Sequence, residues 1–123
     1  MATTACDVLI VEDDRPVREA AAALLEFDGL RVVEAEHGAD ALAALDQGLR
    51  PKVIVLDMIM PMVDGERFLK ARRVDPEVAK IPVVIFSALQ KIPRALAKWN
   101  VVAILSKPVD PPRFLRVVRE HCR

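Results

Sequence analysis

The chain has 123 residues with 18 acidic and 18 basic side chains, so its length suits a single domain spanning residues 1–123. Its formal net charge of zero and pI of about 6.7 argue against nucleic acid or an anionic membrane as a direct partner. Apolar stretches such as residues 20–25 are too short to cross a bilayer, and residues 1–6 lack the regions of a secretory signal, so we expect a cytoplasmic protein.

Five apolar runs alternate with five segments of helical periodicity, the pattern of βαβ units and a parallel sheet. We predict strands at residues 7–11, 30–35, 53–57, 83–87 and 101–105. All except the second are continuously apolar and rich in Val and Ile, as expected of strands covered on both faces. The second run is more mixed, so we place it near an edge of the sheet.

The segments between the strands are predicted helices. The first has Pro16 in its first turn, ends at Gly29, and carries an apolar stripe made of Val17, Ala20, Ala21, Leu24 and Leu25. The others are expected at about residues 39–47, 66–74 and 94–99, and after Pro111 and Pro112, with Gly65 as a tight turn before the third. Right-handed crossovers place helices on both faces of the sheet, so the fold class is a three-layer doubly wound α/β sandwich.

Polar residues stand where the apolar runs end. They are Glu12 and Asp13 after the first run, Asp57 after the third, Ser87 after the fourth and Lys107 near the fifth. The carboxyl ends of parallel strands meet at one edge of a sheet, where open α/β sheets bind their ligands, so we expect these side chains to converge. Carboxylates with one ammonium and one hydroxyl suit a divalent cation and a phosphoryl group better than an apolar ligand.

A magnesium site needs oxygen ligands, usually one or two carboxylates with several waters. Asp13 and Asp57 meet this need, and Glu12 is close enough in sequence to orient a water. Without a cation these acids would repel one another, so a metal or Lys107 must offset part of their charge. The alternative is that Asp13 and Asp14 only begin a helix as partners of its dipole. We favour metal binding because Asp57 independently ends another buried strand.

Four segments together form a recognisable set: VLIVEDD at 8–14, VIVLDMIMPMVDG at 53–65, PVVIFSA at 82–88 and LSKP at 105–108. They resemble the CheY-like receiver domain of two-component response regulators, over about residues 7–119. The resemblance implies a flavodoxin-like (βα)5 fold with strand order 2-1-3-4-5. It also implies a phosphorylation-dependent signalling switch.

In this family an aspartate accepts a phosphoryl group from a histidine kinase or phosphotransfer protein, and the resemblance assigns that role to Asp57. Glu12 and Asp13 match the acidic pair that holds Mg²⁺ together with Asp57 and the backbone carbonyl of Ile59. The domain is then a phosphoacceptor with at most slow self-phosphorylation and self-dephosphorylation, not an enzyme in the usual sense.

Two further residues match functional positions of the family. Ser87 matches the switch hydroxyl that turns toward the phosphoryl oxygens, and Lys107 matches the lysine that pairs with them. Pro108 is then expected to follow a cis peptide bond. Ile104 stands where the family commonly has an aromatic residue that moves with the hydroxyl. The output partner or domain is not evident, and we expect a monomer or a phosphorylation-dependent homodimer.

Two alternatives remain open. One is a receiver-like scaffold that binds partners without being phosphorylated. The other is a Mg²⁺-dependent phosphohydrolase, since carboxylates at strand ends also serve such enzymes. Ile59 stands where a second acid two residues beyond Asp57 would be needed, which disfavours the phosphohydrolase. Four glycines without a GxGxxG or P-loop pattern disfavour a nucleotide-binding module.

Overall fold

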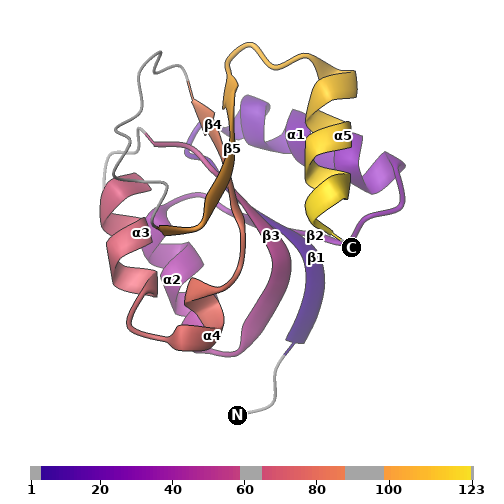
Figure 1. Cartoon of the computed structure of the whole chain (residues 1–123). Helices are drawn as coiled ribbons and strands as arrows, with labels where there is room; N and C mark the ends of the chain where they lie inside the picture. Colours follow the sequence, from indigo (N-terminus) through magenta and orange to yellow (C-terminus); the bar gives the residue numbers. More distant parts are fainter. Residues whose placement is uncertain (1–3, 59–64, 88–98, 123) are drawn as a thin grey trace.

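The computed structural model describes residues 4–58, 65–87 and 99–122. Five parallel strands form one sheet in the order β2-β1-β3-β4-β5 (Figure 1). Their bounds are β1 Thr4–Val11, β2 Val32–Ala35, β3 Leu49–Leu56, β4 Val83–Ser87 and β5 Val101–Ser106. The predicted fold class and strand order are confirmed, and β2 lies at an edge as its mixed sequence indicated.

Helices cover both faces of this sheet. Their bounds are α1 Arg15–Phe27, α2 Gly38–Asp46, α3 Gly65–Arg72, α4 Pro76–Ala79 and α5 Pro111–His121. Helices α1 and α5 lie on one face and α2 and α3 on the other (Figure 1). Two apolar cores result, because alternate residues of a strand point to opposite faces: Leu9 packs with α2 and α3, and Val8 packs with α1 and α5. Among the described helices, none combines the length and apolar character that crossing a membrane requires.

Local sequence explains where the helices begin and end. The side chain of Asp14 accepts a hydrogen bond from the backbone N–H of Val17 at 3.3 Å and caps α1. Asp110 caps α5 in the same way through Arg113. Gly29 follows α1 with φ of +89°, and Gly48 follows α2 with φ of +110°, which are backbone conformations that glycine adopts without steric cost. These caps set the directions in which the chain enters and leaves the strands.

Several predicted boundaries were wrong. Strand β1 begins at Thr4 and β3 at Leu49, earlier than expected, because main-chain pairing between the two strands continues beyond their apolar runs. Strand β2 begins at Val32 rather than residue 30, α3 ends at Arg72 rather than residue 74, and α5 begins at Pro111.

The short helix α4 was not predicted. It is one turn long and capped by Asp75, whose carboxylate accepts a hydrogen bond from the N–H of Glu77 at 2.9 Å. Four residues are too few to show helical periodicity in a sequence. The helix predicted at residues 94–99 lies outside the described residues, apart from Trp99.

Candidate functional site

The register of the sheet brings the predicted site residues to one edge. Val11 and Leu56 are partners in the β1–β3 ladder, and the N–H of Asp57 donates to the carbonyl of Val11 at 3.0 Å. Glu12 and Asp57 therefore follow the ends of adjacent strands. On β4 and β5, the N–H of Lys107 donates to the carbonyl of Ser87 at 3.0 Å. The predicted convergence at the carboxyl edge is thus observed in the main chain.

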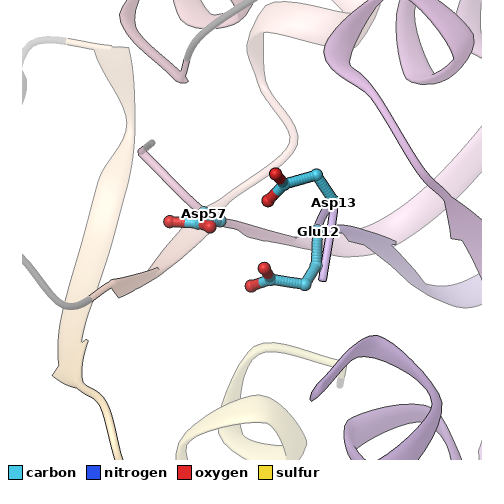
Figure 2. Close-up of side chains that lie close together, drawn as sticks. All are labelled: Glu12, Asp13 and Asp57. Carbon is cyan, nitrogen blue, oxygen red and sulfur yellow. The ribbon is translucent and has the colours of Figure 1, made fainter. Parts of the chain in front are cut away.

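Three carboxylates lie together at this edge. Glu12, Asp13 and Asp57 each offer an oxygen atom, and these atoms lie within 4.8 Å of one another. Figure 2 shows the side chains of Glu12 and Asp13 extending from one loop toward the side on which Asp57 lies. Glu12 is fully buried and Asp57 is 4% exposed. This donor set fits a hard divalent cation, which takes oxygen ligands. Ile59, whose carbonyl was predicted as a further ligand, lies outside the described residues.

The ammonium group of Lys107 lies among these acids. Its Nζ is 2.6 Å from Oε2 of Glu12 and 3.2 Å from Oδ2 of Asp57. Burial alone would lower the pKa of Lys107, but the hydrogen bond to Glu12 and the charges of both carboxylates outweigh it, so the pKa is raised. Lys107 is therefore a permanent cation of the site. The peptide bond between Lys107 and Pro108 is cis, as the resemblance implied.

Glu12 is held at the site by hydrogen bonds to both of its carboxylate oxygens. Burial raises its pKa to about 7, and the neighbouring charge of Asp57 acts in the same direction, against the lowering effect of Lys107. Its Oε1 also accepts a hydrogen bond from the N–H of Asp14 at 3.2 Å. One lysine does not fully offset the buried negative charge, so further positive charge at this place is electrostatically favoured.

Ser87 is the last residue of β4 and is 1% exposed. The residue before it, Phe86, carries the Nζ of Lys107 over its ring at 4.9 Å from the centroid, and the ring stacks on Phe114 of α5 at 5.8 Å. Ile104 on β5 is 46% exposed. The aromatic contacts near the site therefore connect to α5 through Phe86 rather than through position 104.

The structure shows two contacts near the site that were not predicted from the sequence. Arg18 of α1 donates from Nη1 to the carbonyl of Glu12 at 2.9 Å and from Nε to Oε1 of Glu34 at 3.2 Å. Gly65 was predicted as a tight turn before α3; in addition, a Cβ there would lie 2.6 Å from Sδ and 2.7 Å from Cα of Met58, so glycine is needed for a close approach of α3 to the residue after Asp57. The sequence offered no signal for the contact of Arg18, which joins three separate elements.

Residues 8–119 match the response regulator receiver domain family. The chain belongs to this family. The match covers most of the chain and includes β2, β3, β4 and β5 in full and β1 from residue 8 onward. Membership agrees with the resemblance found in the sequence and places the chain among signalling domains that depend on phosphorylation.

Individual proteins and solved structures are similar to the chain over most of its length. The chain is 31% identical over 118 residues to an uncharacterized 14.6 kDa protein of Leptolyngbya boryana, covering 94% of this chain and 89% of that protein. It is 34% identical over 115 residues to the response regulator Rre1 of Synechocystis, covering 91% of this chain but only 49% of that relative. The chain thus spans about half the length of Rre1. The solved structure of the chemotaxis response regulator CheY4 of Vibrio cholerae superposes with a TM-score of 0.85 at 26% identity, covering 96% of this chain and 99% of that one.

Proposed function

We propose that this receiver domain is a switch in which Asp57 accepts a phosphoryl group, in a Mg²⁺-dependent reaction, from a histidine kinase or phosphotransfer protein. The observation that carries the proposal is the placement of Asp57: a buried carboxylate at a strand end, 3.2 Å from the ammonium of Lys107 and grouped with two further carboxylates. A carboxylate in such surroundings can serve as a nucleophile toward phosphorus, because nearby positive charge stabilises the transferring group.

The step forms one bond and breaks one. An oxygen of the Asp57 carboxylate attacks phosphorus, forming an acyl phosphate, while the bond from phosphorus to the donor nitrogen or oxygen breaks and its electron pair leaves with the donor. Lys107 pairs with a phosphoryl oxygen, since its Nζ already contacts Oδ2 of Asp57. The hydroxyl of Ser87 donates a hydrogen bond to another phosphoryl oxygen, in keeping with the main-chain hydrogen bond that joins Ser87 to Lys107.

Glu12, Asp13 and Asp57 are the residues that would hold Mg²⁺ together with the carbonyl of Ile59. When bound, the ion offsets the negative charge of the phosphoryl oxygens. Before any transfer, Glu12 and Asp13 contribute by gathering negative charge that attracts a cation to the nucleophile. Lys107 limits the repulsion among the three acids, because its ammonium contacts both Glu12 and Asp57.

Phosphorylation then changes the surroundings of Ser87 and Lys107 and with them the surface that an output partner or output domain binds. We propose that the domain acts as a monomer or as a phosphorylation-dependent homodimer, without catalysis beyond slow self-phosphorylation and self-dephosphorylation. A scaffold that works without phosphorylation is the competing function, and it would need neither the buried acids nor Lys107.

The test is the mass of the intact protein after incubation with acetyl phosphate and Mg²⁺. We expect one phosphoryl adduct on the wild type, no adduct with a chelator present, and none on Asp57→Asn. Asp46→Asn, which changes an exposed acid at the end of α2, is the matched control and should be modified like the wild type. Absence of an adduct on a wild-type protein that binds Mg²⁺ would favour the scaffold.

A further inference from the structure

Arg18 of α1 is half-buried, with its side chain against the loop that carries two of the three acids. Its side chain is 12% exposed, although arginine is seldom buried without a specific partner. The partners are the main-chain carbonyl of Glu12, 2.9 Å from Nη1, and the carboxylate of Glu34 on β2, 3.2 Å from Nε. One guanidinium therefore joins α1, the end of β1 and the edge strand β2.

The hydrogen bond from Arg18 to Glu12 lies just beyond the end of the pairing between β1 and β3. The β1–β3 ladder ends at the pair Val11 and Leu56, so Glu12 lies one residue beyond it. There the N–H of Glu12 donates to the carbonyl of Ala35 at 3.1 Å, and its carbonyl accepts from Arg18. The two bonds hold the peptide units on either side of the Glu12 Cα, the second of which leads to Asp13. The positions of both acidic side chains depend on these peptide units.

The charge of Arg18 makes its presence there informative. A positive charge beside a cation site repels the cation, so electrostatics alone would favour a neutral residue at position 18. An arginine at this position is explained if the benefit of its hydrogen bonds exceeds the cost of its charge to cation binding. A guanidinium presents several donors in a fixed planar fork, which lets it reach the Glu12 carbonyl and the Glu34 carboxylate together.

We propose that Arg18 is a positioning residue for the divalent-cation site. It holds the main chain of Glu12 and Asp13 in place and thereby increases the affinity of the site for the cation. This inference rests on the proposed function for the identity of the ion, but it concerns a residue that touches neither ion nor phosphoryl group. Groups that orient ligands from outside the coordination shell typically change metal affinity about 10- to 100-fold when they are removed.

The experiment is calorimetric titration of MgCl₂ into wild type, Arg18→Gln and Arg15→Gln. Arg15 is the matched control, because it is a second arginine at the start of α1, 77% exposed, that pairs only with Glu19 among the described residues. Loss of charge alone would leave Mg²⁺ binding unchanged or tighter, and this is the result expected for Arg15→Gln. For Arg18→Gln we expect binding weaker by about tenfold. We also expect its phosphorylation rate to return to the wild-type value at saturating Mg²⁺.

Affinity of Arg18→Gln equal to or tighter than that of the wild type would overturn the proposal, even if the variant were less stable. If Arg18→Gln does not fold, Arg18→Lys is used in its place, because it keeps the charge but not the planar fork of donors. Weaker Mg²⁺ binding by Arg18→Lys supports the proposal, and wild-type affinity contradicts it. A wild-type protein that binds no Mg²⁺ would overturn the proposed function and this inference together. If the wild type binds Mg²⁺ and the Arg18 variant binds it with the same affinity, this inference alone is overturned.

Discussion

Lys107 lies closer to Glu12 than to Asp57. Its Nζ is 2.6 Å from Oε2 of Glu12 and 3.2 Å from Oδ2 of Asp57, and the side chain of Glu12 is 1% exposed. Glu12 is thus the acid in closer contact with the lysine, while the longer contact with Asp57 is the one that a phosphoryl oxygen would replace in the proposed reaction. The same ammonium stabilises the fold and takes part in the proposed chemistry.

Replacing Lys107 by methionine should therefore destabilise the metal-free protein. The variant leaves Glu12 buried without its charged partner, and we expect a loss of about 2 kcal/mol in the free energy of unfolding at pH 7 with a chelator present. Urea unfolding followed by circular dichroism measures this, with the exposed Lys80→Met as control. Mg²⁺ should reduce the loss, because it offsets the same carboxylate charge. A loss that is the same with and without Mg²⁺ would contradict this account of the site.

The contribution of Asp7 to the stability of the protein should depend on pH in the acid range. The backbone N–H of Arg31 donates to Oδ2 of Asp7 at 2.8 Å, and this bond, with Lys52 at 3.3 Å, lowers the pKa of Asp7 below its usual 3.8 against the opposing effect of burial. The carboxylate therefore stabilises the fold above pH 3.8, and this contribution is lost as the pH falls through the lowered pKa.

We expect Asp7→Asn to cost about 1 kcal/mol of unfolding free energy at pH 7, because a neutral amide accepts weaker hydrogen bonds. The difference from the wild type should shrink progressively below pH 3.8. Urea titrations at a series of pH values measure it, with Glu26→Gln on the exposed face of α1 as control. A difference that stays constant down to the lowest pH at which both proteins fold would show that the charge of Asp7 is not the cause.

Gly65→Ala should disturb the chain next to Asp57, the proposed phosphoacceptor. Its Cβ would lie 2.7 Å from the backbone Cα of Met58, the residue after Asp57, and cannot be accommodated by a side-chain rotation alone. We expect a loss of about 2 kcal/mol in stability and slower adduct formation with acetyl phosphate. Gly29→Ala is the control: nothing lies within 4 Å of its Cβ, so the strain of φ +89° should cost about 1 kcal/mol without slowing the reaction. Equal phosphorylation rates in the two variants would refute the local effect.

Arg72 on α3 is a buried cation that links α3 by hydrogen bonds to carbonyl groups elsewhere in the chain. It is 2% exposed and donates to the carbonyls of Val78, Ile81 and Trp99, and burial lowers its pKa to about 10. Arg72→Met would remove these buried hydrogen bonds, so we expect a loss of about 3 kcal/mol and a changed Trp99 fluorescence. Arg73→Met removes only a cation 5.8 Å from the Trp99 ring and should cost much less. Similar losses in the two variants would mean that the buried hydrogen bonds contribute little.

The strands and the acidic edge could be predicted because their causes are local in the sequence. Strands covered on both faces must be apolar throughout, and a functional side chain at the carboxyl edge must follow such a run directly, as Asp57 follows β3 and Ser87 ends β4. The mutual repulsion of the acids also predicted that a metal or Lys107 would offset part of their charge, and Lys107 does contact Glu12 and Asp57. The catalytic and metal-binding roles of these residues remain predictions.

The rest could not be predicted because its causes lie in tertiary contacts. Nothing in the period of α1 distinguishes Arg18, which reaches Glu12 and Glu34, from Arg15, which stays at the surface. The burial of Arg72 depends on carbonyl groups supplied by α4 and by Trp99, and Gly65 depends on the path of the chain at Met58. Such contacts are set by how elements pack, which the hydrophobic pattern of a single element does not contain.

The most direct test of the central claim is to trap the phosphorylated residue. The wild-type protein is incubated with acetyl phosphate and Mg²⁺ and then reduced with borohydride, which converts an aspartyl phosphate to homoserine, and the peptide containing Asp57 is analysed by tandem mass spectrometry. We predict homoserine at position 57, absent when a chelator is present. A phosphoryl group on another residue, or an unmodified Asp57 in a protein that binds Mg²⁺, would contradict the account.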